Sequence, residues 1–98
     1  MTLRVTPLAA ADIEAIVLHI AEDNPRGALN VLDAIEQRLT QLTRYPHSGY
    51  LCDDIGPGIR RLVSGQYLAF YRVRNEEVEV LRVLHGRRKV DPSSITGS

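Results

Sequence analysis

The sequence has little of several residue types, and each scarcity narrows what the protein can be. It has no tryptophan, one cysteine (Cys52) and one lysine (Lys89) among 98 residues. A single cysteine excludes an internal disulfide, which agrees with a reducing compartment. No apolar run approaches the roughly 18–20 residues of a membrane span, and the N-terminal MTLRVTPLAA is too short and too polar for a signal peptide. We therefore expect no membrane association and a cytoplasmic location.

The sequence also lacks an excess of either charge, with 12 basic and 12 acidic side chains. Dedicated nucleic-acid-binding domains are usually basic, with a pI above about 9, so we expect no direct, specific DNA binding. The charges are nevertheless unevenly distributed. Residues 1–59 carry four basic and eight acidic side chains, whereas residues 60–98 carry eight basic and four acidic ones. The second half is therefore predicted to offer a basic surface to an acidic partner.

The first half of the sequence predicts a short strand and two helices. Residues 3–5 alternate as a strand does, and Thr6-Pro7 and Asn24-Pro25 are each typical of a helix start, with a capping side chain before a proline. Tyr45-Pro46 ends the second helix. Because the two helices have almost no connection, they should form an antiparallel helical hairpin. The apolar stripes are Ile13, Ile16, Val17 and Ile20 in the first helix and Ala28, Leu32, Ile35, Leu39 and Leu42 in the second.

The second half predicts a sheet built around one hairpin. Residues 67–74 and 78–85 are rich in aromatic and β-branched side chains, and the polar Asn75–Glu77 lies between them. A loop over residues 46–58 and a strand over 59–63 precede this hairpin, and residues 90–98 are expected to be a flexible tail. The chain is thus predicted to be a single domain, 1–98, of the α+β class. Its N-terminal strand and helical hairpin would pack on a small, mainly antiparallel sheet of three to four strands.

Several short motifs occur in an order that resembles a known family. They are the A-x-x-D-I-x-x-I register of residues 9–16, Ile20-Ala21, Asn24-Pro25, Pro46 with Gly49, Gly58-Ile59-Arg60, YLAFYRV at 67–73 and RVLHGRR at 82–88. Together they resemble the ParE/RelE superfamily of bacterial type II toxins. The resemblance implies a RelE/ParE-like fold and a hetero-oligomer with a cognate, ParD-like antitoxin. For the ParE branch it implies plasmid stabilisation and inhibition of DNA gyrase, and for the RelE branch cleavage of mRNA on the ribosome.

The choice between these branches depends on catalytic side chains. RNA cleavage needs a base, an acid and cations around the scissile phosphate, and Arg60, Arg82 and His85 are the candidates here. The resemblance to RelE-like enzymes implies Arg or Lys residues on the sheet and often a tyrosine or histidine near the C-terminus. Here no tyrosine follows Tyr71, and no aromatic residue follows Lys89. We therefore favour the ParE branch, an inhibitor that acts by binding and has no catalytic residues. A RelE-like ribonuclease and a small structural domain without toxic effect remain as alternatives.

The basic and apolar positions suggest two partner surfaces. Four arginines could instead be solvated or paired with Glu77, Glu79 or Asp91, namely Arg60, Arg82, Arg87 and Arg88. His85 could simply bond a neighbouring backbone group at the strand end. The surface expected to bind the antitoxin comprises Ile13, Ile16, Val17, Ile20, Leu32, Leu39, Arg60, Arg72 and Arg82. The surface expected to bind the target comprises Arg61, His85, Arg87, Arg88 and Lys89.

The remaining acidic and sulfur-containing residues predict no metal or cofactor site. Asp12 and Glu14 are two positions apart on a helix and point to different sides, so they are no catalytic pair. His47, Cys52, Asp53 and Asp54 lie close in sequence, but their spacing matches no metal-ligand signature.

Overall fold

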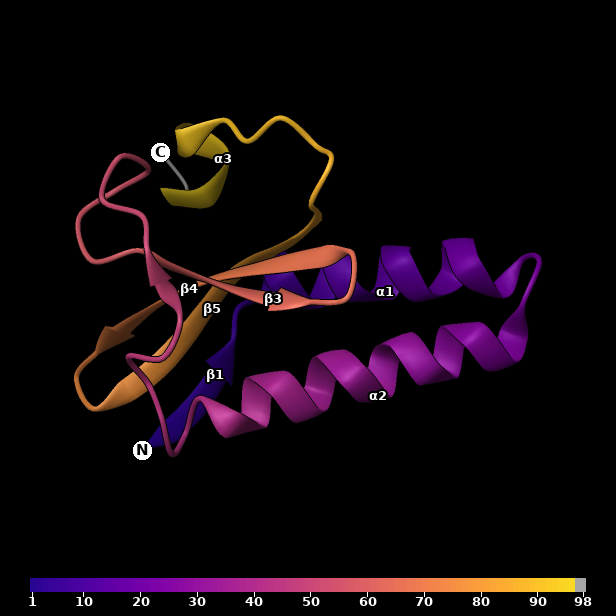
Figure 1. The fold of residues 1–98 in the computed structure, drawn as a ribbon, viewed down its shortest axis with the longest axis horizontal. Coiled ribbons are helices and arrows are strands. Elements are labelled where there is room, and N and C mark those ends of the chain that lie inside the picture. The colour runs from indigo at the N-terminus through magenta and orange to yellow at the C-terminus, as the bar shows by residue number, and fades with distance from the viewer. Residues whose placement is uncertain (97–98) are drawn as a thin grey trace.

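The first half of the chain forms a strand and two antiparallel helices. In the computed structural model, which describes residues 1–96, β1 spans Thr2–Val5, α1 spans Pro7–Ala21 and α2 spans Pro25–Gln41. Both helices begin as the sequence predicts. The Thr6 side chain accepts a hydrogen bond from the Ala9 N–H at 3.2 Å, and the Asn24 side chain accepts one from the Gly27 N–H at 2.9 Å. The helices lie side by side as the predicted hairpin (Figure 1).

The second half forms the rest of the sheet: β2 at Tyr50–Leu51, β3 at Arg60–Ser64, β4 at Tyr67–Arg74 and β5 at Glu77–His85. Within residues 1–96 the sheet has five strands in the order β1-β5-β4-β3-β2. The predicted hairpin, β4–β5, lies at its centre, and β1 pairs with β5 in parallel. Asn75 and Glu76 have φ values of 53° and 59°, as a two-residue type I′ turn requires. The predicted α+β class is confirmed, with β2 added inside the segment predicted as a loop.

A β-bulge on β5 decides which side chains face which side of the sheet. Phe70 pairs with Arg82 but Tyr71 pairs with Val80, so Leu81 is an extra residue on β5. The bulge reverses the alternation beyond it. Val80 and Val83 therefore pack in one core cluster, whereas Leu81 and Leu84 pack in another.

The two core clusters lie on opposite faces of the sheet. The face covered by α1 and α2, here called the helical face, holds the larger cluster. Its most buried members include Ile35, Leu39, Leu42, Leu62, Tyr71, Val78, Val80 and Val83. The other, here called the strap face, holds the smaller cluster of Ile59, Phe70, Leu81, Leu84 and Ile95, with Ile55, Leu68 and Val90 packed against it.

The strap face is covered by a short helix that the sequence did not predict. Helix α3 spans Pro92–Thr96, in the segment expected to be a flexible tail, and Ile95 is buried in the smaller cluster. Figure 1 shows α3 across the sheet from α2, beside the loop that precedes β3. A single apolar residue in a five-residue segment carries no periodic signal. Asp91-Pro92 does repeat the pattern that starts α1 and α2, a capping side chain before a proline. The end of the predicted tail, residues 97–98, lies outside the described residues.

Candidate functional site

An apolar groove of about 260 Å³ lies between β1 and the two helices. Three residues predicted to bind the antitoxin, Ile13, Leu32 and Leu39, line this groove. Leu3 and Val5 of β1 complete its wall, although neither was among the residues predicted to bind a partner. Since β1 is an edge strand with one unpaired side, the groove combines apolar side chains with free backbone groups. The full lining is Leu3, Val5, Ala10, Ile13, Leu32, Glu36, Leu39 and Thr40.

A second groove, of about 370 Å³, lies where the helices pass the β3–β4 turn. It holds Ile20, another residue predicted to bind the antitoxin, together with Val31 and Ala34 of α2 and residues 64–67. Ile16 is packed against the larger core cluster instead, and Val17 is half-buried. The predicted apolar set is therefore divided among two grooves and the core.

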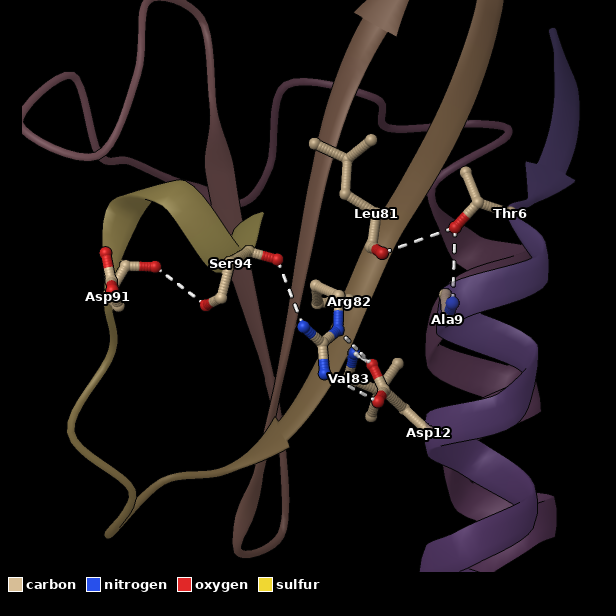
Figure 2. A network of polar contacts seen from close by, with 8 residues as sticks. All are labelled: Thr6, Ala9, Asp12, Leu81, Arg82, Val83, Asp91 and Ser94. Atoms are coloured by element: carbon tan, nitrogen blue, oxygen red, sulfur yellow. Dashed lines mark hydrogen bonds and ion pairs between the residues drawn. The ribbon is translucent and has the colours of Figure 1, made fainter. Parts of the chain in front are cut away.

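Arg82 is held by contacts within the protein. Its Nε and Nη2 donate to the two carboxylate oxygens of Asp12 on α1, at 2.6 and 2.9 Å, and its Nη1 donates to the Ser94 carbonyl of α3 at 3.1 Å. The Asp12 carboxylate also accepts from the Val83 N–H, so it caps the edge of β5 beyond β1. Figure 2 shows Arg82 between α1 and α3. The hydrogen bonds to Asp12 raise the pKa of Arg82, and burial opposes this.

Arg60 also makes internal contacts. Its Nη1 donates to the carbonyls of His47 and Gly49, at 3.1 and 2.8 Å. The buried Tyr71 hydroxyl accepts from the Gly49 N–H at 2.8 Å, and burial raises the pKa of that phenol. A Cβ on Gly49 would lie 2.5 Å from the Tyr71 hydroxyl, so only glycine fits this close approach. Arg60 and Tyr71 therefore fix the loop that follows α2.

Arg72 belongs to a charged row on the strap face. Glu79 accepts from Arg72 on β4 and from Arg4 on β1, so one carboxylate joins three neighbouring strands. Glu79 was predicted as a possible partner of an arginine, and the structure places it beside Arg72. Its pairing with Arg4 was not predicted, because it depends on β1 lying next to β5.

His85 bonds locally at the end of β5. Its Nδ1 accepts from the Arg87 N–H at 3.0 Å, so Nε2 carries the proton and donates to the Gln66 side chain at 3.2 Å. Its ring meets Tyr67 edge to face at 5.4 Å.

The three candidate catalytic residues of the ribonuclease alternative do not converge. Along β4, His85 pairs with Tyr67 and Arg60 with Tyr71, so the two lie roughly 13 Å apart along the sheet. Arg82 pairs with Phe70, between these two positions, and its side chain is directed to Asp12 on α1. These three side chains therefore do not surround one reacting atom in the part of the chain that the structure describes.

The other residues predicted to bind the target are exposed. Arg61 lies over the Tyr50 ring at 4.9 Å on the strap face. Arg87, Arg88 and Lys89 lie on the segment between β5 and α3, and their side chains make no hydrogen bond or ion pair with residues 1–96. They are the one run of three consecutive cationic side chains in the sequence.

The described residues offer neither a metal site nor a membrane span. Among residues 1–96, His, Cys, Asp and Glu side chains form no cluster of three or more suited to a metal ion. None of the helices there is long and apolar enough to cross a bilayer. Cys52 is buried, and burial raises the pKa of its thiol.

Comparison with protein families adds to this geometry. A family model described as the ParE toxin of the type II toxin–antitoxin system parDE matches residues 3–90. The chain is 39% identical over 61 residues to toxin ParE1 of Mycobacterium tuberculosis, a match covering 61% of this chain and 62% of that protein's length.

Two solved structures share the fold. One is from the chromosomal ParDE toxin–antitoxin system of P. aeruginosa, with a TM-score of 0.76 and 30% identity, covering 87% of this chain and 95% of that one. The other is from the toxin–antitoxin complex RelBE2 of M. tuberculosis, with a TM-score of 0.65 and 26% identity, covering 86% of this chain and 95% of that one.

Proposed function

This chain belongs to the ParE toxin family of type II toxin–antitoxin systems, and we propose that it is a toxin that inhibits DNA gyrase by binding and is held inactive by a ParD-like antitoxin. One observation carries the proposal beyond family membership. The arginines that a ribonuclease would need are bonded within the fold, whereas a separate run of cations is free for a partner. Such an arrangement suits binding better than bond cleavage.

A supercoiling assay with purified gyrase tests the proposed target. Excess toxin should stop supercoiling, and prior addition of the antitoxin should restore it. Uninhibited gyrase at excess toxin would remove this target. The same preparation, added to a translation extract, tests the ribonuclease alternative, for which the proposal expects intact mRNA.

The antitoxin is proposed to lie in the groove between β1 and the helical hairpin. An apolar groove beside an open strand edge can bind an amphipathic segment through both side chains and backbone. Val5 tests this, because it lines the groove and is exposed. Val5→Glu should weaken antitoxin binding by about 100-fold, close to the loss of one buried apolar anchor at an interface.

Leu29→Glu is the matched control, because Leu29 is 65% exposed on α2 and does not line the groove. Equal losses in the two variants would place the interface elsewhere. Charge reversal at Arg60 or Arg82 is a poorer test, since both side chains hold the fold together.

A further inference from the structure

The segment between β5 and α3, here called the basic turn (residues 86–91), is fixed at its first end. The Gly86 N–H donates to the Gln66 carbonyl at 2.8 Å, which ties the turn to the β3–β4 connection. The Arg87 N–H donates to the His85 ring at 3.0 Å, and the Arg88 N–H donates to the His85 carbonyl at 3.0 Å. The backbone that carries the first two cations is therefore held by three hydrogen bonds.

The second end is fixed by α3. Asp91 accepts from the Ser93 N–H at 3.0 Å and starts the helix, while Val90 packs against the smaller core cluster. Ile95 is 3% exposed in that cluster, and the Ser94 carbonyl accepts from Arg82. Figure 2 shows α3 returning to the sheet, where Ser94 meets Arg82. The basic turn is therefore a loop with an anchor at each end.

Between these anchors, Arg87, Arg88 and Lys89 are exposed and unpaired within residues 1–96. Elsewhere, five arginines each bond an oxygen of the protein: Arg4, Arg38, Arg60, Arg72 and Arg82. Three others, Arg26, Arg44 and Arg74, are exposed without such a bond within residues 1–96, but each stands alone in the sequence. Cations on an anchored loop lose less conformational freedom when a partner binds than cations on a free tail would lose. This preorganisation favours binding.

We infer that the basic turn is an anion-binding surface for an acidic segment of a partner protein, and that α3, through Ile95 and Arg82, is what positions it. The inference rests on the proposed function in one respect, since the acidic segment would belong to the toxin's target. Arginine pairs with carboxylates through two parallel hydrogen bonds, and two adjacent arginines suit a short run of Asp and Glu.

A nucleic acid fits this surface less well. The chain as a whole is neutral, with a pI near 6.8, and its basic run is too short to follow a phosphate backbone. The rings of Tyr67 and His85, which pair at the start of the turn, already contact each other edge to face. This contact makes the two rings less available for base stacking.

A labelled oligo-glutamate peptide tests the surface directly, with binding followed by fluorescence anisotropy at two salt concentrations. The wild-type protein should bind it, more weakly at high salt. The variant R87E/R88E/K89E should bind at least about tenfold more weakly. The control R26E/R44E/R74E makes the same change in net charge at exposed arginines elsewhere and should lose less than about threefold.

Three outcomes would overturn the surface: no binding to the wild type, equal loss in both triple variants, or tighter binding of an oligothymidylate with the same charge as the peptide. None of these depends on gyrase, so the result is separate from the supercoiling assay. If the toxin binds the peptide but leaves gyrase active, gyrase is refuted as the target. The proposal that the basic turn binds an acidic segment of a partner would still stand.

The positioning role of α3 is tested at Ile95. Ile95→Asp should release the helix and weaken peptide binding by about five- to tenfold, whereas the conservative Ile95→Val should restore it. The antitoxin affinity of each variant serves as the fold control, because the antitoxin groove is on the helical face. Amide exchange of residues 93–96 shows whether α3 is released in Ile95→Asp. Unchanged peptide binding in a variant whose α3 is released would contradict the positioning role.

Discussion

The two faces of the sheet are built from the same strands but are stabilised in different ways. The helical face is covered by two long helices whose apolar stripes continue its core, with Tyr71, Val78 and Val80 almost inaccessible to solvent. The strap face is covered by a five-residue helix attached through one isoleucine and one arginine, with Ile55 and Val90 packed beside it. The difference indicates that the helical face determines the fold, whereas the strap face can carry charge and local mobility at little expense to stability.

Two isoleucines with equal burial provide the strongest test of this contrast. Ile35 on the helical face is 2% exposed and Ile95 on the strap face is 3% exposed. Ile35→Ala should lower the free energy of unfolding by about 4 kcal/mol through lost burial and an unfilled cavity. Ile95→Ala should lower it by only about 1–2 kcal/mol, because α3 can undock without global unfolding. Urea denaturation measures both, and equal losses would show that the faces do not differ.

Removal of Asp12 should give the next largest effect. The Asp12 and Arg82 side chains are only 14% and 12% exposed, and the carboxylate also accepts from the Val83 N–H. Asp12→Ala should therefore lower the free energy of unfolding by about 3 kcal/mol, since it leaves a nearly buried guanidinium unpaired. Glu14→Ala, on the exposed side of the same helix, should change it by less than about 0.5 kcal/mol. A loss in Asp12→Ala no larger than in this control would refute the structural role of the pair.

Local sequence patterns predict only the parts of this fold that depend on residues close together in the chain. Thr6, Asn24 and the strand pattern of the hairpin act through neighbours a few positions away, so local chemistry was enough to predict both helices and the central hairpin. Arg82 could not be assigned in this way, because its partner is 70 positions earlier and is brought near only when α1 covers the edge of β5. Leu81 illustrates the same limit, since a bulge leaves no mark in apolar periodicity.

The candidate site was predictable to a similar extent. The groove residues Ile13, Leu32 and Leu39 follow from helical spacing, and the free cations of the basic turn follow from composition. The contribution of β1 to the groove depends on a parallel pairing with β5, which the sequence does not encode locally. The sharing of Glu79 between two arginines depends on the same pairing.

The charged row on the strap face should contribute less to the free energy of unfolding than the Asp12–Arg82 pair. Glu79 is nearly buried, but Arg72 and Arg4 are 34% and 50% exposed at their side chains. Glu79→Gln should lower the free energy of unfolding by about 0.5–1 kcal/mol, discounted for solvent screening. Because exposed charges are screened by salt, this loss should shrink in 1 M NaCl. A larger loss, independent of salt, would mean that the row contributes by packing.

Titration of Cys52 should have the smallest effect on the free energy of unfolding. Burial raises the pKa of the folded thiol above its ordinary value, so the folded state keeps a proton that the unfolded state releases. The resulting stabilisation is complete at neutral pH and declines as pH rises from the ordinary thiol pKa through the raised one. Cys52→Ala should remove this alkaline decline. Iodoacetamide should label the folded thiol at least about tenfold more slowly than the thiol in urea, and equal rates would contradict its burial.

Amide hydrogen exchange on the toxin with each partner in turn tests most directly whether the two faces serve two partners. Binding of the antitoxin should protect β1 and the groove-lining turns of α1 and α2, while leaving the basic turn free to exchange. Binding of the proposed target, a gyrase subunit, should protect residues 86–96 and leave the groove unchanged. Protection of the same residues by both partners would contradict the proposal that the antitoxin binds the groove on the helical face and the target binds the basic turn.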